Sequence, residues 1–114
     1  MNMPGQILRV FFFRTETGNE PVRAWLRELS KESKKIVGED IKTVQFGWPL
    51  GMPLVRKLEA GLWEVRSNIP DGITRVLFTI IEHDMILLHA FKKKSQKAPT
   101  RDLSLARFRL KQLQ

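Results

Sequence analysis

The sequence predicts a small α+β protein in which a strand, two helices, three strands and a last helix follow one another. Three observations support this prediction. The chain has 114 residues, 42% of them hydrophobic, which suffices for one domain, residues 1–114, with a single core. Apolar side chains recur with a helical period in its first half, and strand-like runs separated by short turns fill most of its second half. We therefore expect an N-terminal strand and a helical hairpin to pack on an antiparallel sheet, together with a C-terminal helix.

The N-terminal part is predicted to form one strand and one helix. Gln6–Phe13 is rich in branched and aromatic residues, which is typical of a strand. Gly18 then turns the chain, Asn19 can cap a helix, and Pro21 is tolerated in the first helical turn. The apolar side chains of this helix recur at i, i+3, i+4 and i+7: Val22, Trp25, Leu26 and Leu29.

A second helix follows directly and completes the hairpin. Ser30 can cap it, and Gly47 and Pro49 stop it. Its apolar residues keep the helical period: Val37, Ile41 and Val44. The proline-containing segment Trp48–Pro53 is predicted to be an irregular connection.

Three strands are predicted at about Leu62–Ser67, about Ile73–Ile81 and about Met85–Phe91. Turn residues at Ile69–Gly72 and Glu82–Asp84 separate them. Because these connections are short, the three strands should form an antiparallel meander.

The last helix is predicted to open at Pro99 and Thr100. Its apolar side is formed by Leu103, Ala106, Leu110 and Leu113.

Two arginines of the predicted sheet should share one face, because side chains alternate along a strand. Arg66 alternates with Glu64, and Arg75 alternates with Leu77. The residues on the opposite side of the second of these strands are more apolar and should face the helices: Thr74, Val76, Phe78 and Ile80. We therefore expect Arg75 on the less apolar, open face of the sheet, with Arg66 beside it on the neighbouring strand.

The following strand is apolar on both sides, so its register stays open. His89, Phe91 and Lys93 share one of its faces, and Ala90 and Lys92 share the other.

Positive charge is concentrated at the C-terminal end of the chain. From His89 onward there are eight basic residues and one acid, Asp102, which accounts for +7 of the net charge of +8. This distribution predicts a surface for a polyanion, with nucleic acid and the ribosome as leading partners and acidic proteins as second choice.

Several classes of chemistry are disfavoured by composition. The absence of cysteine excludes disulfides and thiol catalysis, and two histidines offer no metal signature. No glycine-rich phosphate loop or nucleophile elbow occurs, and nothing suggests a cofactor. The apolar run Ile7–Phe13 is too short to span a membrane, so we expect a cytoplasmic protein without a membrane partner.

Two arginines beside a lysine cluster have a specific use in RNA cleavage. When a 2′-OH attacks the adjacent phosphate, negative charge builds on the non-bridging oxygens, and fixed cations lower that barrier. Arginine can hold a phosphate through two parallel hydrogen bonds. A lysine crowded by other cations has a lowered pKa, which suits it to proton transfer.

Structural interpretations of the same residues stay open. Arg66 and Arg75 could be ordinary surface residues, and the lysines could form a solvated turn. His89 follows an apolar run and fits a structural role, whereas Trp48 could stack on a base. Glu64 could either hold Arg66 in place or act as a base.

Four segments resemble the phage-related HigB-like branch of the RelE/ParE toxin superfamily. They are KLEAGLWEVR at Lys57–Arg66, TRVLF at Thr74–Phe78, LLHAFKKK at Leu87–Lys94 and KAP at Lys97–Pro99. The resemblance covers essentially the whole chain and implies a RelE-like fold. It also implies the toxin of a type II toxin–antitoxin pair, acting as a ribosome-dependent endoribonuclease that cleaves mRNA and inhibits translation.

The resemblance also implies roles for individual residues and partners. Arg66 and Arg75 match the strand arginines of RelE-like active sites, and Lys93 lies where those enzymes place another basic residue. Thr74 stands where relatives often have tyrosine, and this chain has none. The implied partners are the ribosome, mRNA, a helix-turn-helix antitoxin of the HigA type, and operator DNA through that antitoxin. We assign further RNA contacts to Lys57, Lys92, Lys94 and Lys97.

Two rival functions share this fold. ParE-like members poison DNA gyrase without cutting RNA, and a fold alone does not decide function. A degraded toxin that only joins its antitoxin at DNA is a third possibility. Arg66, Arg75 and the lysine cluster favour the ribonuclease.

Overall fold

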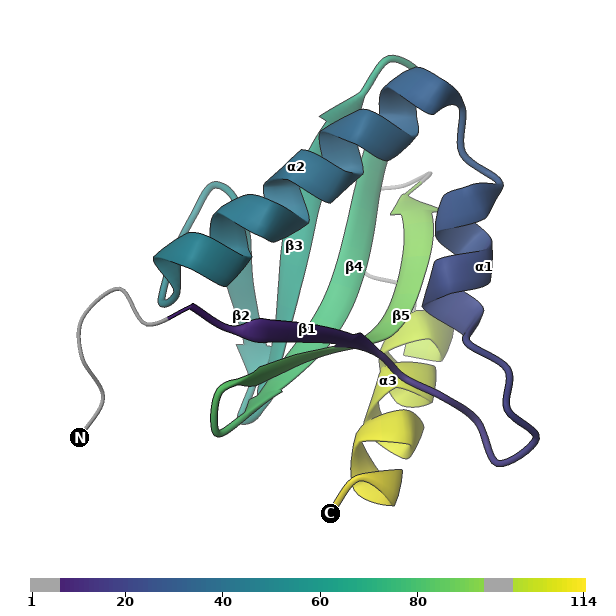
Figure 1. Cartoon of the computed structure of the whole chain (residues 1–114), viewed down its shortest axis with the longest axis vertical. Coiled ribbons are helices and arrows are strands. Elements are labelled where there is room, and N and C mark those ends of the chain that lie inside the picture. The colour runs from purple at the N-terminus through teal and green to yellow at the C-terminus, as the bar shows by residue number, and fades with distance from the viewer. Residues whose placement is uncertain (1–6, 94–99) are drawn as a thin grey trace.

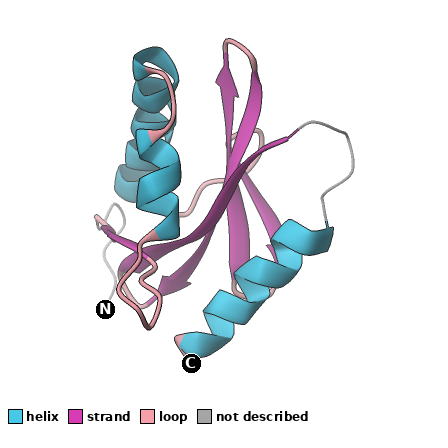
Figure 2. Cartoon of the chain, turned by 90° about the vertical axis from the view of Figure 1, so that its right-hand side faces the viewer, coloured by secondary structure: helices cyan, strands magenta, loops and turns pink. Residues whose placement is uncertain are grey.

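A five-stranded sheet lies between two helices on one face and one helix on the other (Figures 1 and 2). The structure, a computed structural model, describes residues 7–93 and 100–114. Its elements follow in chain order: β1 (Arg9–Phe12), α1 (Pro21–Arg27), α2 (Lys31–Gly47), β2 (Val55–Glu59), β3 (Leu62–Ile69), β4 (Gly72–Ile81), β5 (Asp84–Lys93) and α3 (Thr100–Gln112). The predicted α+β class is confirmed.

The sheet has the strand order β1-β5-β4-β3-β2. The expected meander of β3, β4 and β5 is confirmed, since neighbouring strands pair antiparallel. The sheet as a whole is mixed, because β1 runs parallel to β5 at one edge. Arg9 lies opposite Asp84 there, and its Nε donates to Asp84 Oδ1 at 2.7 Å.

The strand β2 was not expected from the sequence. It pairs antiparallel with β3 after the tight connection through Gly61, whose φ of +76° lies in the left-handed region that favours glycine. β2 is an edge strand in which Arg56, Lys57 and Glu59 interrupt any apolar alternation. Charged residues are a common feature of sheet edges, and here they hide the strand from a periodicity argument.

The helical hairpin begins and ends close to the expected residues. The Ser30 hydroxyl accepts a hydrogen bond from the Ser33 backbone N–H at 3.2 Å, which confirms Ser30 as the cap of α2. The expected cap of α1 is wrong: Glu20 occupies the N-cap position and Pro21 the first helical position. Asn19 belongs instead to the preceding turn, where its backbone N–H donates to the Thr15 hydroxyl.

The two faces of the sheet bury separate apolar clusters. The face toward α1 and α2 contains, among others, Val22, Val37, Val44, Val65, Val76 and Phe78. The face toward α3 buries Phe13, Leu62, Leu77, Leu88, Ala106 and Leu110. The expectation that Val76 and Phe78 face the helical hairpin is therefore confirmed. Among the described helices, none combines the length and apolarity needed to cross a membrane.

Candidate functional site

The two candidate arginines lie side by side on the α3 face of the sheet. Arg66 of β3 is the direct partner of Arg75 of β4, and Arg75 is the direct partner of Phe91 of β5. This row across three strands confirms the expected proximity of the two arginines. Neighbouring strands are about 4.8 Å apart, so the side chains of such a row are in reach of one another.

Two further rows flank this one on the same face, because residues two apart on a strand point the same way. One row runs from Arg56 of β2 through Glu64 and Leu77 to His89. The other runs from Asn68 through Ile73 to Lys93. We name Arg56, Arg66, Arg75 and Lys93 the basic cluster; together with Glu64, its members come from four different strands.

A buried ion pair lies inside the basic cluster. Arg75 Nη1 donates to Glu64 Oε2 at 3.2 Å, and the two side chains are only 2% and 1% exposed. Three nearby polar atoms are buried and have no hydrogen-bond partner among the described residues: Glu64 Oε1, Arg66 Nε and Arg75 Nε. Part of the site is thus already desolvated in the free protein.

The expectation that this face of the sheet is open is wrong at Arg75. Leu62 and Leu77 lie on the same face and pack against Ala106 and Leu110 of α3. The helix therefore closes over part of this face, as Figure 2 shows from the side. Arg66 stays partly exposed, so it offers the more accessible guanidinium of the pair.

Lys93 has an electrostatic environment unlike that of an ordinary surface lysine. Desolvation lowers the pKa of its ammonium group below the usual 10.5, and the charges of Arg75, Arg66 and Arg56 lower it further. Glu64 acts in the opposite direction and raises it. The neutral amine of Lys93, which is the form that can accept a proton, is therefore more populated than in a free lysine.

His89 connects the site to α3. Its Nε2 lies 2.6 Å from Asp102 Oδ1, in the first turn of that helix. Its ring is stacked on Phe91 with centroids 5.7 Å apart and an interplanar angle of 26°. Phe91 is partly exposed and is the strand partner of Arg75, so an aromatic ring lies next to the paired arginines.

The remaining candidate lysines are not brought together with the basic cluster. Lys57 is the partner of Trp63 and lies on the α1/α2 face, with its Nζ 5.9 Å from the Trp63 ring centroid. Lys92 is the partner of Thr74, also on that face, and forms an ion pair with Asp71. Lys94 and Lys97 lie outside the described residues.

Trp48 packs in the apolar interior. Its ring meets Trp63 edge-on with centroids 5.1 Å apart, and Phe78 at 5.7 Å. Both partners belong to or pack on the core beneath α1 and α2. Base stacking by Trp48 therefore has no support in this geometry, whereas Phe91 lies at the basic cluster.

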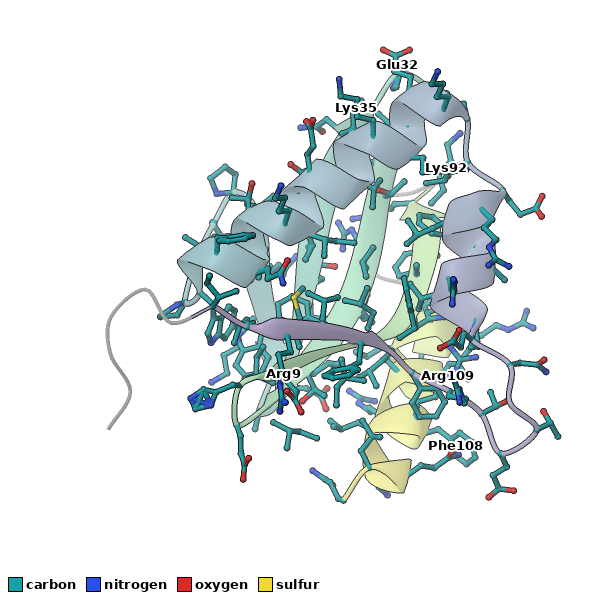
Figure 3. The ribbon with its side chains drawn as sticks, viewed as in Figure 1. Arg9, Glu32, Lys35, Lys92, Phe108 and Arg109 are labelled. Carbon is teal, nitrogen blue, oxygen red and sulfur yellow. The ribbon has the colours of Figure 1, made fainter. Side chains whose placement is uncertain are left out.

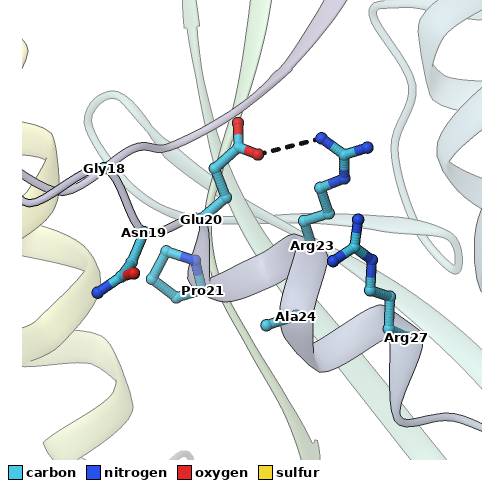
Figure 4. Close-up of a pocket in the computed structure, with 7 residues that line it drawn as sticks. All are labelled: Gly18, Asn19, Glu20, Pro21, Arg23, Ala24 and Arg27. Atoms are coloured by element: carbon cyan, nitrogen blue, oxygen red, sulfur yellow. Dashed lines mark hydrogen bonds and ion pairs between the residues drawn. The ribbon is translucent and has the colours of Figure 1, made fainter.

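Two hollows lie away from the basic cluster. One, of about 350 Å³, lies beside the start of α1, where Arg23 pairs with Glu20 at 3.2 Å (Figure 4). Another, also about 350 Å³, is lined by Phe13, Phe108, Arg109 and neighbouring residues. Figure 3 shows Phe108 and Arg109 at the end of the molecule away from Lys92. Neither hollow is lined by a member of the basic cluster.

Arg56 is the site residue that sequence reasoning missed. Its position on the sheet could not be predicted because β2, the strand that carries it, was not predicted. The available signal was the pair Ala60–Gly61, which allows a tight hairpin between β2 and β3.

Comparison with known proteins identifies one family. The family model described as phage-derived protein Gp49-like (DUF891) matches residues 24–111, which includes every member of the basic cluster. No curated protein matches this chain. Within residues 7–93 and 100–114, no group of three or more histidine, aspartate or glutamate side chains is placed to hold a metal ion.

Proposed function

This chain belongs to the Gp49-like family of phage-derived proteins, a RelE/HigB-like toxin family, and we propose that it is the toxin of a type II toxin–antitoxin pair that cleaves mRNA on the ribosome. Toxins of this kind need a surface that binds RNA and a small set of groups that promote phosphodiester cleavage. The basic cluster on the α3 face of the sheet supports an assignment of both roles to this face.

The observation that supports the proposal most is the row of Arg66, Arg75 and Phe91 with Lys93 beside it. Fixed guanidinium groups stabilise the charge that develops on a phosphate in the transition state. An adjacent aromatic ring can stack on a nucleobase, which fixes the position of the neighbouring phosphate. Phe91 can provide stacking but has no hydroxyl group with which to transfer a proton. Since the chain has no tyrosine, another residue must take that role.

In the proposed reaction Lys93 accepts the proton of the 2′-OH. The 2′-oxygen forms a bond to phosphorus, and the bond to the 5′-oxygen of the next nucleotide breaks. The leaving oxygen takes a proton from solvent, so the products are a cyclic phosphate and a free 5′-hydroxyl end. Arg66 contacts the non-bridging oxygens, and Arg75 contributes its charge from below the surface.

The proposed partners follow from the family and from the charge. A toxin needs a cognate antitoxin, for which we propose a small helix-turn-helix protein of the HigA type that carries the complex to operator DNA. The net charge of +8 supports attraction to the ribosome and its mRNA. We place this activity in the cytoplasm, where translation occurs.

Induced expression in bacteria tests the proposal. Protein synthesis should stop before DNA synthesis, and new 5′ ends should appear inside coding regions of mRNA. The Arg66→Ala variant should lose growth inhibition, whereas Arg27→Ala, an exposed arginine of α1, should keep it.

The rival activity on DNA gyrase gives a different pattern. In that case translation continues at first while DNA breaks accumulate, and purified ribosomes with bound mRNA are not cut. Such a result would replace the ribonuclease with a ParE-like gyrase poison.

A further inference from the structure

We infer that Glu64 is a positioning residue of the basic cluster, whose carboxylate holds the guanidinium of Arg75 and partly neutralises the cations around Lys93. This inference rests on the proposed function, because it assigns a role within the same site. It also makes a claim about the free protein that can be measured without RNA.

The geometry supports this role through strand register. Glu64 is the direct partner of Arg56 on β2 and lies two residues before Arg66 on β3. Its Oε2 accepts a hydrogen bond from Arg75 Nη1 on β4. One carboxylate thus pairs with the guanidinium of Arg75, and Arg56 and Arg66 occupy neighbouring positions of the same sheet face.

Glu64 itself is not placed to touch RNA. Its side chain is 1% exposed, whereas Arg66 and Lys93 are partly exposed. A carboxylate at the surface would also repel a phosphate. Glu64 must therefore act through its neighbours rather than on the substrate.

The hydrogen bond from Arg75 has a directional consequence. Nη1 donates to Glu64, whereas Nε is buried and has no hydrogen-bond partner among the described residues. A guanidinium is planar, so one fixed corner orients the whole group. Without Glu64, Arg75 would have no acidic partner on this face within the described part of the chain.

Charge balance gives Glu64 a second effect. Among residues 7–93 and 100–114, the charged groups that act on Lys93 are Arg56 of β2, Glu64 and Arg66 of β3, and Arg75 of β4. His89 of β5 lies two rows further along the same face, where it pairs with Asp102 of α3. Glu64 raises the pKa of Lys93 against the three arginines. Removing its charge should therefore lower that pKa further.

The test compares Glu64→Gln and Glu64→Asp with the full-length wild-type protein. The glutamine variant keeps the shape and removes the charge, whereas the aspartate variant keeps the charge and shortens the reach to Arg75. Glu39→Gln makes the same charge change at an exposed position of α2 and serves as the control. An NMR titration of the Lys93 side chain reports its pKa in the free protein, and single-turnover cleavage on programmed ribosomes reports the pH profile.

In Glu64→Gln we expect the Lys93 titration and the pH limb of cleavage to move together to lower pH, because the carboxylate that raises the pKa of Lys93 is lost. In Glu64→Asp the titration should stay near that of wild type, while the cleavage rate falls because Arg75 is no longer held. Glu39→Gln should change neither. A purely structural role would lower the amount of folded protein without moving the Lys93 titration.

The inference and the proposed function can fail separately. If wild-type protein cuts no RNA but the Lys93 titration shifts in Glu64→Gln, the proposed function fails and the role of Glu64 stands. If cleavage occurs and both the titration and the pH limb are unchanged in folded Glu64→Gln, the role of Glu64 is overturned. Should Glu64→Gln fail to fold, an unchanged rate in Glu64→Asp overturns the positioning of Arg75, and a reduced rate supports it.

Discussion

At the scale of single residues, the two arginines of the site differ in burial although they are neighbours in the sheet. Arg75 is 2% exposed and pairs with Glu64, whereas Arg66 is partly exposed. A buried ion pair contributes little net stability, but removing one partner leaves an uncompensated charge in a dry environment. The same substitution should therefore have different consequences at the two positions.

We predict that Arg75→Ala lowers the free energy of unfolding by about 3–5 kcal/mol, because Glu64 is left buried without a partner. Arg66→Ala should cost about 1 kcal/mol or less, as is usual for a partly exposed residue without a buried partner. Urea unfolding of both variants measures the difference. The double variant Glu64→Leu with Arg75→Met should recover most of the loss. Equal midpoints for the two alanine variants would show that the pair does not matter for stability.

The pH dependence of cleavage follows from Lys93. Its pKa is lowered from 10.5, and the neutral amine is the reactive form in the proposed reaction. The rate should therefore rise about tenfold per pH unit at low pH and reach a plateau at a pH below 10.5. Lys93→Arg keeps the positive charge but cannot release a proton, so it should bind RNA and cleave at least about 100-fold more slowly.

The control for this prediction is Lys92→Arg, on the opposite face of β5. This variant should keep the wild-type rate and profile. If Lys93→Arg retains the wild-type rate at every pH, Lys93 is not the base, and its role is electrostatic.

At the scale of elements, α3 packs on the same face of the sheet that carries the basic cluster. Besides its apolar side, two of its polar residues contact the sheet. Asp102 pairs with His89 of β5. Arg107 donates two hydrogen bonds to Glu59 Oε1 of β2, from Nε at 2.9 Å and from Nη2 at 2.7 Å. These contacts join the helix to both flanks of the sheet face. α3 is therefore held on the sheet by charged side chains as well as by apolar packing.

The contact between Glu59 and Arg107 should make α3 sensitive to acid. Hydrogen bonding to Arg107 lowers the pKa of Glu59 below its usual 4.5. The unfolded chain therefore takes up this proton at a higher pH than the folded protein. The contribution of this ion pair to the stability of the folded protein is fully present above about pH 4.5. It is lost as the pH falls through the lowered pKa of Glu59 in the folded protein.

Amide hydrogen exchange across this pH range measures the effect. We expect protection of α3 to fall more steeply than protection of α2, and Glu59→Gln to abolish that difference in slope. The effect should be modest, because both side chains are at least one-third exposed. Parallel loss of protection in α2 and α3 would contradict a local attachment.

At the scale of the whole molecule, charge is divided unevenly along the chain. Residues 1–88 carry 12 basic and 11 acidic residues, and the rest carry almost the entire net charge. Arg56, Arg66 and Arg75 belong to the nearly neutral residues 1–88, yet the fold places their charges close enough to act on Lys93. The face that we propose to bind RNA is thus assembled by the sheet and extends beyond the basic C-terminal segment.

Two neighbouring residues test which face of the molecule meets RNA. Arg56 lies on the face of the basic cluster, and Lys57 lies on the face toward the helical hairpin. We predict that Arg56→Ala weakens binding of single-stranded RNA and lowers the slope of log affinity against log salt by about 1. Lys57→Ala should change both much less. The reverse order, measured by fluorescence anisotropy over a range of salt concentrations, would place RNA on the α1/α2 face.

Much of the fold and part of the site could be predicted from the sequence. The helices and four of the strands, all except β2, were identified because their side chains follow local patterns, such as a period of 3.6 or 2 residues. The same alternation placed Arg66 and Arg75 together, since a meander with short turns leaves few choices of register. Ser30 as the cap of α2 is another local feature, because its partner is only three residues away.

The remaining features depend on contacts between residues far apart in the chain, so only the tertiary structure decided them. The parallel pairing of β1 with β5, the packing of α3 on the sheet and the burial of Arg75 are of this kind. The clearest case is β2, where a register shift between Lys57 and Glu59 changes which side chain lies opposite Glu64. A shift of one residue exchanges the two faces of a strand, which is why Arg56 lies at the site and Lys57 does not.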